Sequence, residues 1–356
     1  MIENASLTFP FIASSGIAIF ALETSRIVRM AVTVRSFAKI NLGLAIGLQR
    51  PDRFHALETI YQTVAAHDVI RVEAARGNGI EIRCKNPGVP CDETNTCYRV
   101  ADRMLRHWKQ RAKVAITIEK NLPVQGGLGA GSSNAVATMF ALERELKEPL
   151  AAAERLRIAA EVGCDLPLFL LGGTVLGLGR GEQVYPLADL PAVACVLVTP
   201  TVAVSTPQAF RDWDAFIESD SKAWNLTPPG DHVTLSKFNG SAFEWLSYLD
   251  VSGVPVESDG DRAETPLLDL VRAGIENDFE RVVFPQYPEL RDVKRVLERE
   301  GADYASLSGS GSTLYGLFRT RERAVQAAER MSAEGLATTV TETLPRDQYR
   351  AQMFAK

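Results

Sequence analysis

The chain has 356 residues, of which 46% are hydrophobic and 23% are charged, as is usual for a globular protein of about two domains. Its formal net charge of −5 argues against nucleic acid or a membrane surface as a partner, because both need clustered basic charge. The cysteines have no pair at the two-residue spacing of a zinc or redox motif, and their odd number fits the reducing cytoplasm. We interpret the five cysteines, Cys84, Cys91, Cys97, Cys164 and Cys195, as small buried hydrophobic residues. A zinc site formed by Cys84, Cys91 and Cys97 is the alternative.

Residues 1–29 are predicted to be an extension that is not part of the fold. The apolar run at 9–22 resembles the core of a signal peptide, but it lacks a basic start and is flanked by Glu3 and Glu23. It is also too short to span a bilayer. Because Met30 directly precedes a strand-like run, we expect translation to start there.

The first half of the chain is predicted to mix strands with three helices. Residues 31–48 alternate strictly, with Ile40 and Leu42 on one face and Lys39 and Asn41 on the other, which predicts a long strand. A Pro-Asp turn signal then breaks the pattern. Further strands are expected at 68–75, 79–84 and 114–123, a hairpin at 174–187, and helices at 94–111 (capped by Thr94 or Asn95), about 133–147 and 150–163.

The second half mixes the two element types without strict alternation. A stretch at 214–264 is polar and rich in Pro, Gly and Ser, which predicts a surface insertion. These patterns together favour an α+β fold with largely antiparallel or mixed sheets in two domains that meet near 186–195. The expected elements are strands at 192–200 and 336–344, a strand–loop–strand unit at 302–318, and helices at 265–284, 287–301 and 321–335.

The segment "LPVQGGLGAGSSNAVATM", residues 122–139, predicts a loop that holds phosphate. In a Walker loop the last glycine is followed by Lys and then by Ser or Thr, whereas here Gly131 is followed by two serines. A dinucleotide fingerprint needs G-x-G-x-x-G, whereas this loop reads G-x-G-x-G, so it is neither. Glycines still let backbone N–H groups approach an anion, and the start of the following helix adds unsatisfied donors. The alternative is a glycine-rich turn with a serine N-cap.

Four other features each have a functional and a plain interpretation. Lys39, within an apolar strand, either shields an edge or projects into a site. Asp165 either caps a short helix or orients and deprotonates an attacking hydroxyl. The Gly/Ser loop at 306–318 is either a hairpin turn or a second backbone surface that faces substrate, and His55 is either a ligand-facing group or a satisfied loop histidine.

The combination and order of these motifs resemble the GHMP kinases. The resemblance rests on "FAKINLGLAIGLQRPDRFHALETIYQ", "LPVQGGLGAGSSNA", "GCDLPLFLLGGT", "NDFE" and "LSGSGSTLYGLF", and runs from about Met30 to the C-terminus. It implies the two-domain GHMP kinase fold. A ribosomal protein S5 domain 2-like, ATP-binding domain is expected at 30–190, and a ferredoxin-like domain at 191–356 that contains the insertion at about 214–264.

The resemblance also implies a reaction and its residues. "AKINLGL" followed by "FH" is similar to the branch that phosphorylates a cytidine-diphosphate-linked methylerythritol in non-mevalonate isoprenoid biosynthesis, with ATP and Mg²⁺. Lys39 and Asp165 fall on the catalytic pair, and Ser133 on a metal position. The substrate side falls on Asn41, Phe54, His55 and Phe210, where Phe54 lacks the hydroxyl of the usual tyrosine. The ATP loop falls on Pro123, Val124, Gln125, Gly126, Gly127, Leu128, Gly129, Ala130, Gly131, Ser132 and Ser133.

Two other functions stay open at this point. One is another GHMP small-alcohol kinase, which Asn41, Phe54 and His55 argue against. The other is a nucleotide-binding relative without catalysis, which would not need both Lys39 and Asp165. We expect a small-molecule substrate, no nucleic acid or membrane partner and a cytoplasmic location. The sequence leaves the oligomeric state open.

Overall fold

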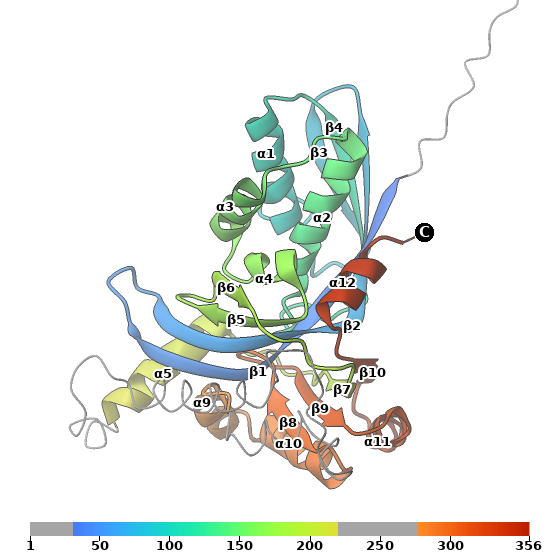
Figure 1. Cartoon of the computed structure of the whole chain (residues 1–356). Coiled ribbons are helices and arrows are strands. Elements are labelled where there is room, and N and C mark those ends of the chain that lie inside the picture. The colour runs from blue at the N-terminus through green and yellow to red at the C-terminus, as the bar shows by residue number, and fades with distance from the viewer. Residues whose placement is uncertain (1–30, 220–275, 356) are drawn as a thin grey trace, which may run out of the picture. The chain divides into compact units, whose positions relative to one another are not determined.

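The computed structural model describes residues 31–219 and 276–355, which form two β-sheets with helices packed against each (Figure 1). The predicted α+β class with antiparallel and mixed sheets is confirmed. Several predictions lie outside the described residues: the extension at 1–29, the start at Met30, positions 220–264 of the insertion and positions 265–275 of a predicted helix.

The first sheet is built on a long hairpin. Strand β1 (Val32–Gln49) pairs antiparallel with β2 (His55–Ala75). Most of β1 is buried on both faces, so its alternation did not separate a core face from a solvent face. The sheet order is β3-β4-β2-β5-β6, formed by β3 (Gly79–Cys84), β4 (Lys113–Glu119), β5 (Thr174–Leu178) and β6 (Gln183–Pro186).

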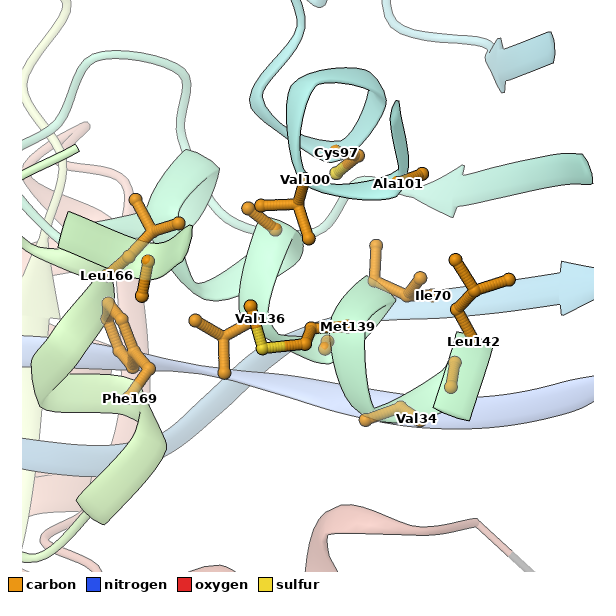
Figure 2. Close-up of a cluster of buried hydrophobic side chains, with 14 of the residues drawn as sticks. Val34, Ile70, Cys97, Val100, Ala101, Val136, Met139, Leu142, Leu166 and Phe169 are labelled. Carbon is orange, nitrogen blue, oxygen red and sulfur yellow. The ribbon is translucent and has the colours of Figure 1, made fainter. Parts of the chain in front are cut away.

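Helices from the same half of the chain pack beside this sheet. Helix α2 (Ala130–Leu146) contacts both β1 and β2, and its Val136, Met139 and Leu142 point into a buried cluster with Val34 and Ile70 of the strands (Figure 2). The predicted N-cap at Asn95 is confirmed, because its Oδ1 accepts a hydrogen bond from Cys97 N at 2.8 Å. The other helices are α1 (Thr96–Trp108), α3 (Ala152–Val162) and α4 (Leu166–Leu171).

The second sheet is antiparallel throughout, in the order β10-β7-β9-β8. Its strands are β7 (Ala194–Val198), β8 (Tyr304–Leu307), β9 (Leu314–Phe318) and β10 (Thr338–Glu342). Helices α10 (Pro288–Arg299) and α11 (Arg321–Ala333) pack on it. The strands predicted at 192–200, 302–318 and 336–344 and the helices predicted at 287–301 and 321–335 are therefore confirmed, with small differences at their ends.

Several segments differ from the sequence predictions. Strand β2 begins at His55, although a strand was expected only at 68–75. The start of the predicted insertion, 214–219, is the end of helix α5 (Thr206–Ser219), which was not predicted, and which buries Trp213. Residues 276–279 were expected to be helical, but Asn277 instead forms an isolated parallel bridge with Leu44, and helix α9 begins only at Glu280 (Glu280–Gln286). Helix α12 (Arg346–Met353) was not predicted and packs back on β1.

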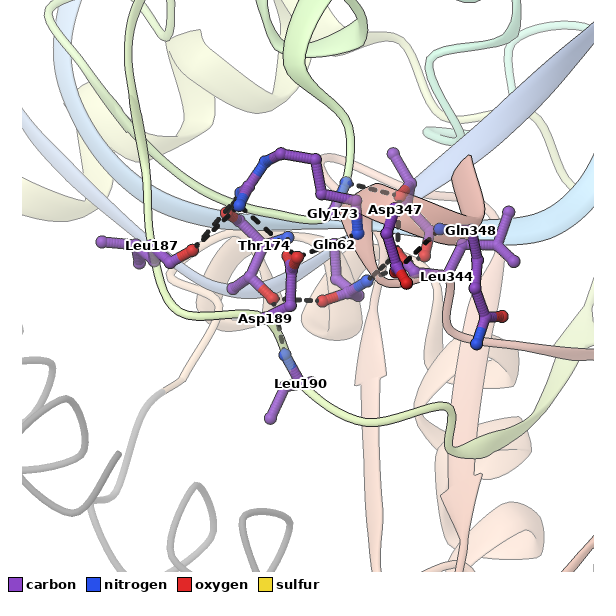
Figure 3. A network of polar contacts seen from close by, with 11 residues as sticks. Gln62, Gly173, Thr174, Leu187, Asp189, Leu190, Leu344, Asp347 and Gln348 are labelled. Carbon is purple, nitrogen blue, oxygen red and sulfur yellow. Dashed lines mark hydrogen bonds and ion pairs between the residues drawn. The ribbon is translucent and has the colours of Figure 1, made fainter. Parts of the chain in front are cut away.

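The predicted domain boundary at 190–191 falls in the connection between the two sheets. Figure 3 shows a polar network there, in which Asp189 Oδ1 accepts from Thr174 N and Asp189 Oδ2 from Arg346 N, both at 2.9 Å. Gln62 Nε2 also donates to Leu344 O at 3.0 Å. These contacts tie the connection to the C-terminal segment; the domain limits themselves stay a prediction.

Candidate active site

Two cavities meet at the glycine loop, by which we mean residues 123–133. The larger cavity has a volume of about 620 Å³, and the smaller one about 380 Å³. Gly127 and Gly129 line both. Among the predicted site residues, the larger cavity is lined by Lys39, Asn41, Phe54, His55, Asp165 and Phe210, and the smaller by every residue from Pro123 to Ser132.

The glycine loop turns into helix α2 earlier than the sequence predicted. Gln125, Gly127 and Gly129 have φ of 60°, 77° and 65°, so the backbone is left-handed at alternate positions. A Cβ on Gly127 would lie 2.0 Å from Ser308 O, so a side chain there is excluded. Gly129 is the N-cap of α2 and the helix begins at Ala130, not at about 133 as predicted, which excludes the alternative of a serine N-cap. The first N–H groups of α2 therefore border the smaller cavity.

The buried carboxylate of Asp68 is hydrogen-bonded to both ends of the glycine loop. Asp68 of β2 is fully buried and accepts hydrogen bonds from Asn121 N at 2.7 Å and Leu122 N at 2.8 Å, at the entry to the loop. It also accepts from Asn134 Nδ2, in the first turn of α2, at 3.1 Å. Lys120 Nζ, 2.7 Å away, neutralises its charge. One side chain thus joins the two ends of the loop.

We predict that Asp68→Asn destabilises the protein by about 3–5 kcal/mol, because the buried Lys120 ammonium loses its counter-charge. The measurement is the free energy of unfolding in urea. The matched control is Glu119→Gln on the neighbouring strand, whose ion pair with Arg71 at 3.2 Å is about half exposed and should contribute at most about 1 kcal/mol. Equal losses for the two variants would contradict this role of Asp68.

Lys39 projects into the larger cavity from the apolar strand β1. Its side chain is 4% exposed, and Nζ donates to Asn41 Oδ1 at 2.6 Å. Burial lowers the pKa of Lys39 from its ordinary value, while the negative charge of Asp165 acts in the opposite direction. The amide of Asn41 is itself oriented by Thr59, whose Oγ1 accepts from Nδ2 at 2.8 Å. Lys39 therefore lies in the interior, which excludes the alternative of an edge-shielding lysine.

Asp165 faces the same cavity from the start of α4. Its carboxylate makes no capping hydrogen bond to that helix, so the capping interpretation fails. Instead, Tyr61 Oη donates to Asp165 Oδ1 at 3.2 Å. Burial, followed by the charge of Asp165, raises the pKa of Tyr61 well above its ordinary value, so the phenol stays protonated and keeps donating. The Nζ of Lys39 lies 5.6 Å from the centre of the Tyr61 ring.

The aromatic residues line the larger cavity together with His55. The His55 ring is 5% exposed and stacks on Phe210, with ring centres 4.8 Å apart and planes 12° apart. His55 Nε2 lies 2.7 Å from Asp214 Oδ1 of α5. Phe54 is 49% exposed, and the Arg180 guanidinium lies 4.8 Å from its ring centre. The rings offer flat apolar surfaces of the kind on which a nucleobase stacks.

The second loop, Ser308–Thr313, packs against the glycine loop. Ser308 Oγ donates to Gly127 O at 3.0 Å, and Thr313 N donates to Gly126 O at 3.2 Å. Gly309 and Ser310 line the larger cavity beside Lys39. This loop is therefore more than a hairpin turn, since it forms one wall of the cavity.

Ser133 and the cysteines differ from the sequence expectations. The Ser133 side chain is 2% exposed and its Oγ accepts from Ser36 Oγ at 2.7 Å, whereas Ser132 borders the smaller cavity. All five cysteines are free, and the described residues include no group of three His, Cys, Asp or Glu side chains that could hold a metal. The zinc alternative for Cys84, Cys91 and Cys97 is thus wrong. Burial raises the pKa of Cys97 to about 12, as expected of an inert core thiol.

Sequence reasoning missed three residues of this site: Asp68, Tyr61 and Asp214. Asp68 and Tyr61 lie on β2, and Asp214 falls where the polar composition had predicted an insertion. Nothing in the sequence singled out Asp68, because the same strand also carries the carboxylates of Glu58 and Glu73. Tyr61 and Asp214 had no signal either, because their partners are distant in sequence.

None of the described helices is long and apolar enough to cross a membrane.

Comparison with known proteins identifies the family. Residues 95–173 match the GHMP kinases N terminal domain, and residues 264–337 match the GHMP kinases C terminal domain. The chain is 33% identical over 316 residues to the 4-diphosphocytidyl-2-C-methyl-D-erythritol kinase of Acaryochloris marina, covering 88% of this chain and 93% of that protein. It is 34% identical over 322 residues to the enzyme of the same name from Desulfitobacterium hafniense, covering 90% and 98%.

Solved structures agree with the sequence matches. A crystal structure of 4-(cytidine 5'-diphospho)-2C-methyl-D-erythritol kinase superposes with a TM-score of 0.65 at 27% identity, covering 87% of this chain and 98% of that one. Homoserine kinase from Cytophaga hutchinsonii shares the fold, with a TM-score of 0.64 at 19% identity, covering 90% and 97%. The chain therefore belongs to the GHMP kinase family, in the group of the 4-diphosphocytidyl-2-C-methyl-D-erythritol kinases.

Proposed function

We propose that this protein transfers the γ-phosphoryl group of ATP to the C2 hydroxyl of 4-diphosphocytidyl-2-C-methyl-D-erythritol, giving the 2-phosphate and ADP in isoprenoid precursor biosynthesis. The observation that carries the proposal is the convergence of Lys39 and Asp165 on one cavity that adjoins the glycine loop. The names of the relatives supply the substrate. The stacked His55 and Phe210 supply a surface for its cytosine.

The glycine loop is proposed to hold the phosphates of ATP. Its left-handed glycines leave no side chain between the backbone and an anion, and the first turn of α2 adds N–H donors. The smaller cavity, which extends from the loop to Val89 and Asn95, is then the place for the adenosine. Phosphoryl transfer of this kind depends chiefly on positioning and on neutralising charge.

The residues present fit a Mg²⁺ ion that binds together with ATP. Magnesium sites of this kind use one or two carboxylates, substrate phosphates and water. Asp165 lines the larger cavity and Ser132 the smaller, whereas Ser133 is buried and lines neither, so we assign the metal-facing hydroxyl to Ser132. When bound, the ion would offset negative charge on the phosphates.

Lys39 and Asp165 are proposed to have separate roles, the first on the transferring phosphoryl group and the second on the acceptor hydroxyl. The Lys39 ammonium, held by Asn41, would attract the oxygens of the transferring phosphoryl group. The Asp165 carboxylate, held by Tyr61, would orient the acceptor hydroxyl and take its proton. Retention of both residues in one cavity argues against a nucleotide-binding relative without catalysis.

One assay tests the function. The purified protein is given Mg-ATP with 4-diphosphocytidyl-2-C-methyl-D-erythritol, and separately with mevalonate or homoserine. We expect ADP formation with the first acceptor only. Turnover of a small alcohol in its place would favour another GHMP kinase, and no turnover of the first acceptor would overturn the proposal.

The aromatic site gives a prediction about acceptor binding. Phe210→Leu keeps apolar volume but removes the ring that stacks on His55. Since a base that stacks on an aromatic side chain gains about 1–3 kcal/mol, the KM for the acceptor should rise at least about 5-fold. The KM for ATP should stay unchanged. Tyr185→Ala, an aromatic residue on β6 that is 51% exposed, is the control and should change neither constant; an unchanged acceptor KM in Phe210→Leu would remove Phe210 from the site.

We also propose a cytoplasmic location. The five free cysteines support a reducing compartment. ATP, the proposed phosphoryl donor, is a cytoplasmic metabolite as well.

A further inference from the structure

The segment Asn277–Glu280, which reads "NDFE", has no role in the function described so far. Asn277 and Asp278 are 2% and 5% exposed. Their backbone lies beside strand β1 and forms a parallel bridge with it: Leu44 N donates to Glu276 O at 3.0 Å, and Asp278 N donates to Leu44 O at 2.9 Å. The segment is thus attached to the strand that carries Lys39.

The same segment is hydrogen-bonded to the second loop, Ser308–Thr313, and to Leu307 directly before it. Asn277 Nδ2 donates both of its hydrogens, to Leu307 O and to Gly309 O, each at 2.8 Å. Glu280 Oε1 accepts from Leu307 N at 2.9 Å. Because both amide hydrogens of Asn277 are donated to this loop, the side chain determines where the Gly309 carbonyl points.

This arrangement turns one backbone donor toward the cavity. The Gly309–Ser310 peptide is trans, so the Ser310 N–H points opposite to the Gly309 carbonyl, away from buried Asn277. Neither Gly309 N nor Ser310 N finds an acceptor within 31–219 and 276–355. Both residues line the larger cavity, and a Cβ on Gly309 would lie only 3.4 Å from Lys39 Nζ.

We propose that Asn277 is a positioning residue that holds the Ser310 N–H as a donor to a phosphate oxygen bound beside Lys39. The inference rests on the proposed function, because it assumes a phosphorylated ligand in this cavity. Two sources share that chemistry: the phosphoryl group in transfer and the diphosphate of the acceptor. A preorganised backbone donor of this kind typically contributes about 10²- to 10³-fold to kcat.

The first test compares Asn277→Asp and Asn277→Ala with wild type. Both variants remove the two donated hydrogen bonds, and kcat should fall about 10²-fold. Gln326→Glu on the exposed face of α11 makes a matched amide-to-carboxylate change and should leave kcat unchanged. A purely structural role would lower the melting temperature and the fraction of active enzyme, but would leave kcat per active site unchanged, and that result would overturn the proposal.

Ligand affinities distinguish the two sources. If the donor serves the phosphoryl group in transfer, the variants should bind Mg-ADP with aluminium fluoride about 10²-fold more weakly and bind the acceptor normally. If it serves the diphosphate, acceptor affinity should fall while the affinity for the fluoride complex is kept. Normal affinity for both ligands in the folded variants would contradict the proposal.

A measurement on the wild-type protein covers the case in which the variants do not fold. The Ser310 amide resonance is identified in ¹⁵N-serine-labelled protein by its loss in Ser310→Ala. It should shift downfield with one of the two ligands, and no shift with either would overturn the proposal. The outcome is separable from the proposed function, because wild-type turnover of the acceptor tests the function alone.

Discussion

Asp165→Asn should lower kcat by at least about 10²-fold and leave the KM for ATP nearly unchanged. The asparagine has almost the same shape, so the ligands still fit, but a neutral amide cannot take a proton from the acceptor hydroxyl. General-base catalysis contributes about 10²- to 10⁴-fold, which sets the expected size. Steady-state kinetics with each substrate varied in turn measures both constants.

Two further variants sharpen this result. Asp347→Asn makes the same chemical change at an exposed residue of α12 that lines neither cavity, and should have no effect. Tyr61→Phe removes only the 3.2 Å hydrogen bond that orients Asp165, so its kcat should lie between those of wild type and Asp165→Asn. A near-normal rate for Asp165→Asn would exclude proton transfer to this residue.

Lys39→Met should lower kcat by about 10²- to 10³-fold, because the side chain keeps its length and loses the charge that faces the phosphoryl group. The free energy of unfolding should not fall, and we expect it to rise. Burial is the dominant influence on the Lys39 ammonium, so the charge is costly in the folded state. A gain in stability together with a loss of activity is typical of a residue kept for function.

Lys39→Arg is the control for charge. It keeps the cation, but the surroundings are tight: a Cβ on Gly129 would lie 3.1 Å from Lys39 Cγ, and one on Gly309 would lie 3.4 Å from Nζ. We therefore expect a rate well below wild type, because a planar guanidinium does not fit the place of an ammonium. Full activity of Lys39→Met would show that catalysis does not need the positive charge of Lys39.

The pH profile should show the lowered pKa of Lys39. Only the protonated amine can neutralise phosphate charge, so activity is retained below the pKa and lost as the pH rises through it. Because burial lowers that pKa from 10.5, the alkaline decline of kcat/KM should begin at a lower pH than for an exposed lysine. The decline should be absent in the residual activity of Lys39→Arg, and an unchanged alkaline limb in that variant would assign the ionisation to another group.

Much of the site could be predicted from local sequence. The composition of the glycine loop predicted phosphate binding, and the resemblance to the GHMP kinases pointed to Lys39 and Asp165; all three lie at the two cavities. The long first strand and the helices α1 and α11 were also predictable, since their apolar periods and caps depend on neighbours in sequence. The start of α2 was not, because the left-handed Gly129 begins the helix before the serines.

The sequence by itself determined the fold class and singled out the glycine loop, Lys39 and Asp165, which we propose as the phosphate loop and the catalytic pair. Only the tertiary structure decided what holds them in place: Tyr61 reaches Asp165 across 104 residues of chain, and His55 reaches Asp214 across 159. Asp68 supports the glycine loop, and Asn277 supports the second loop, in the same way. The physical reason is that propensity and periodicity act between near neighbours, whereas these contacts form only when distant strands and helices pack together.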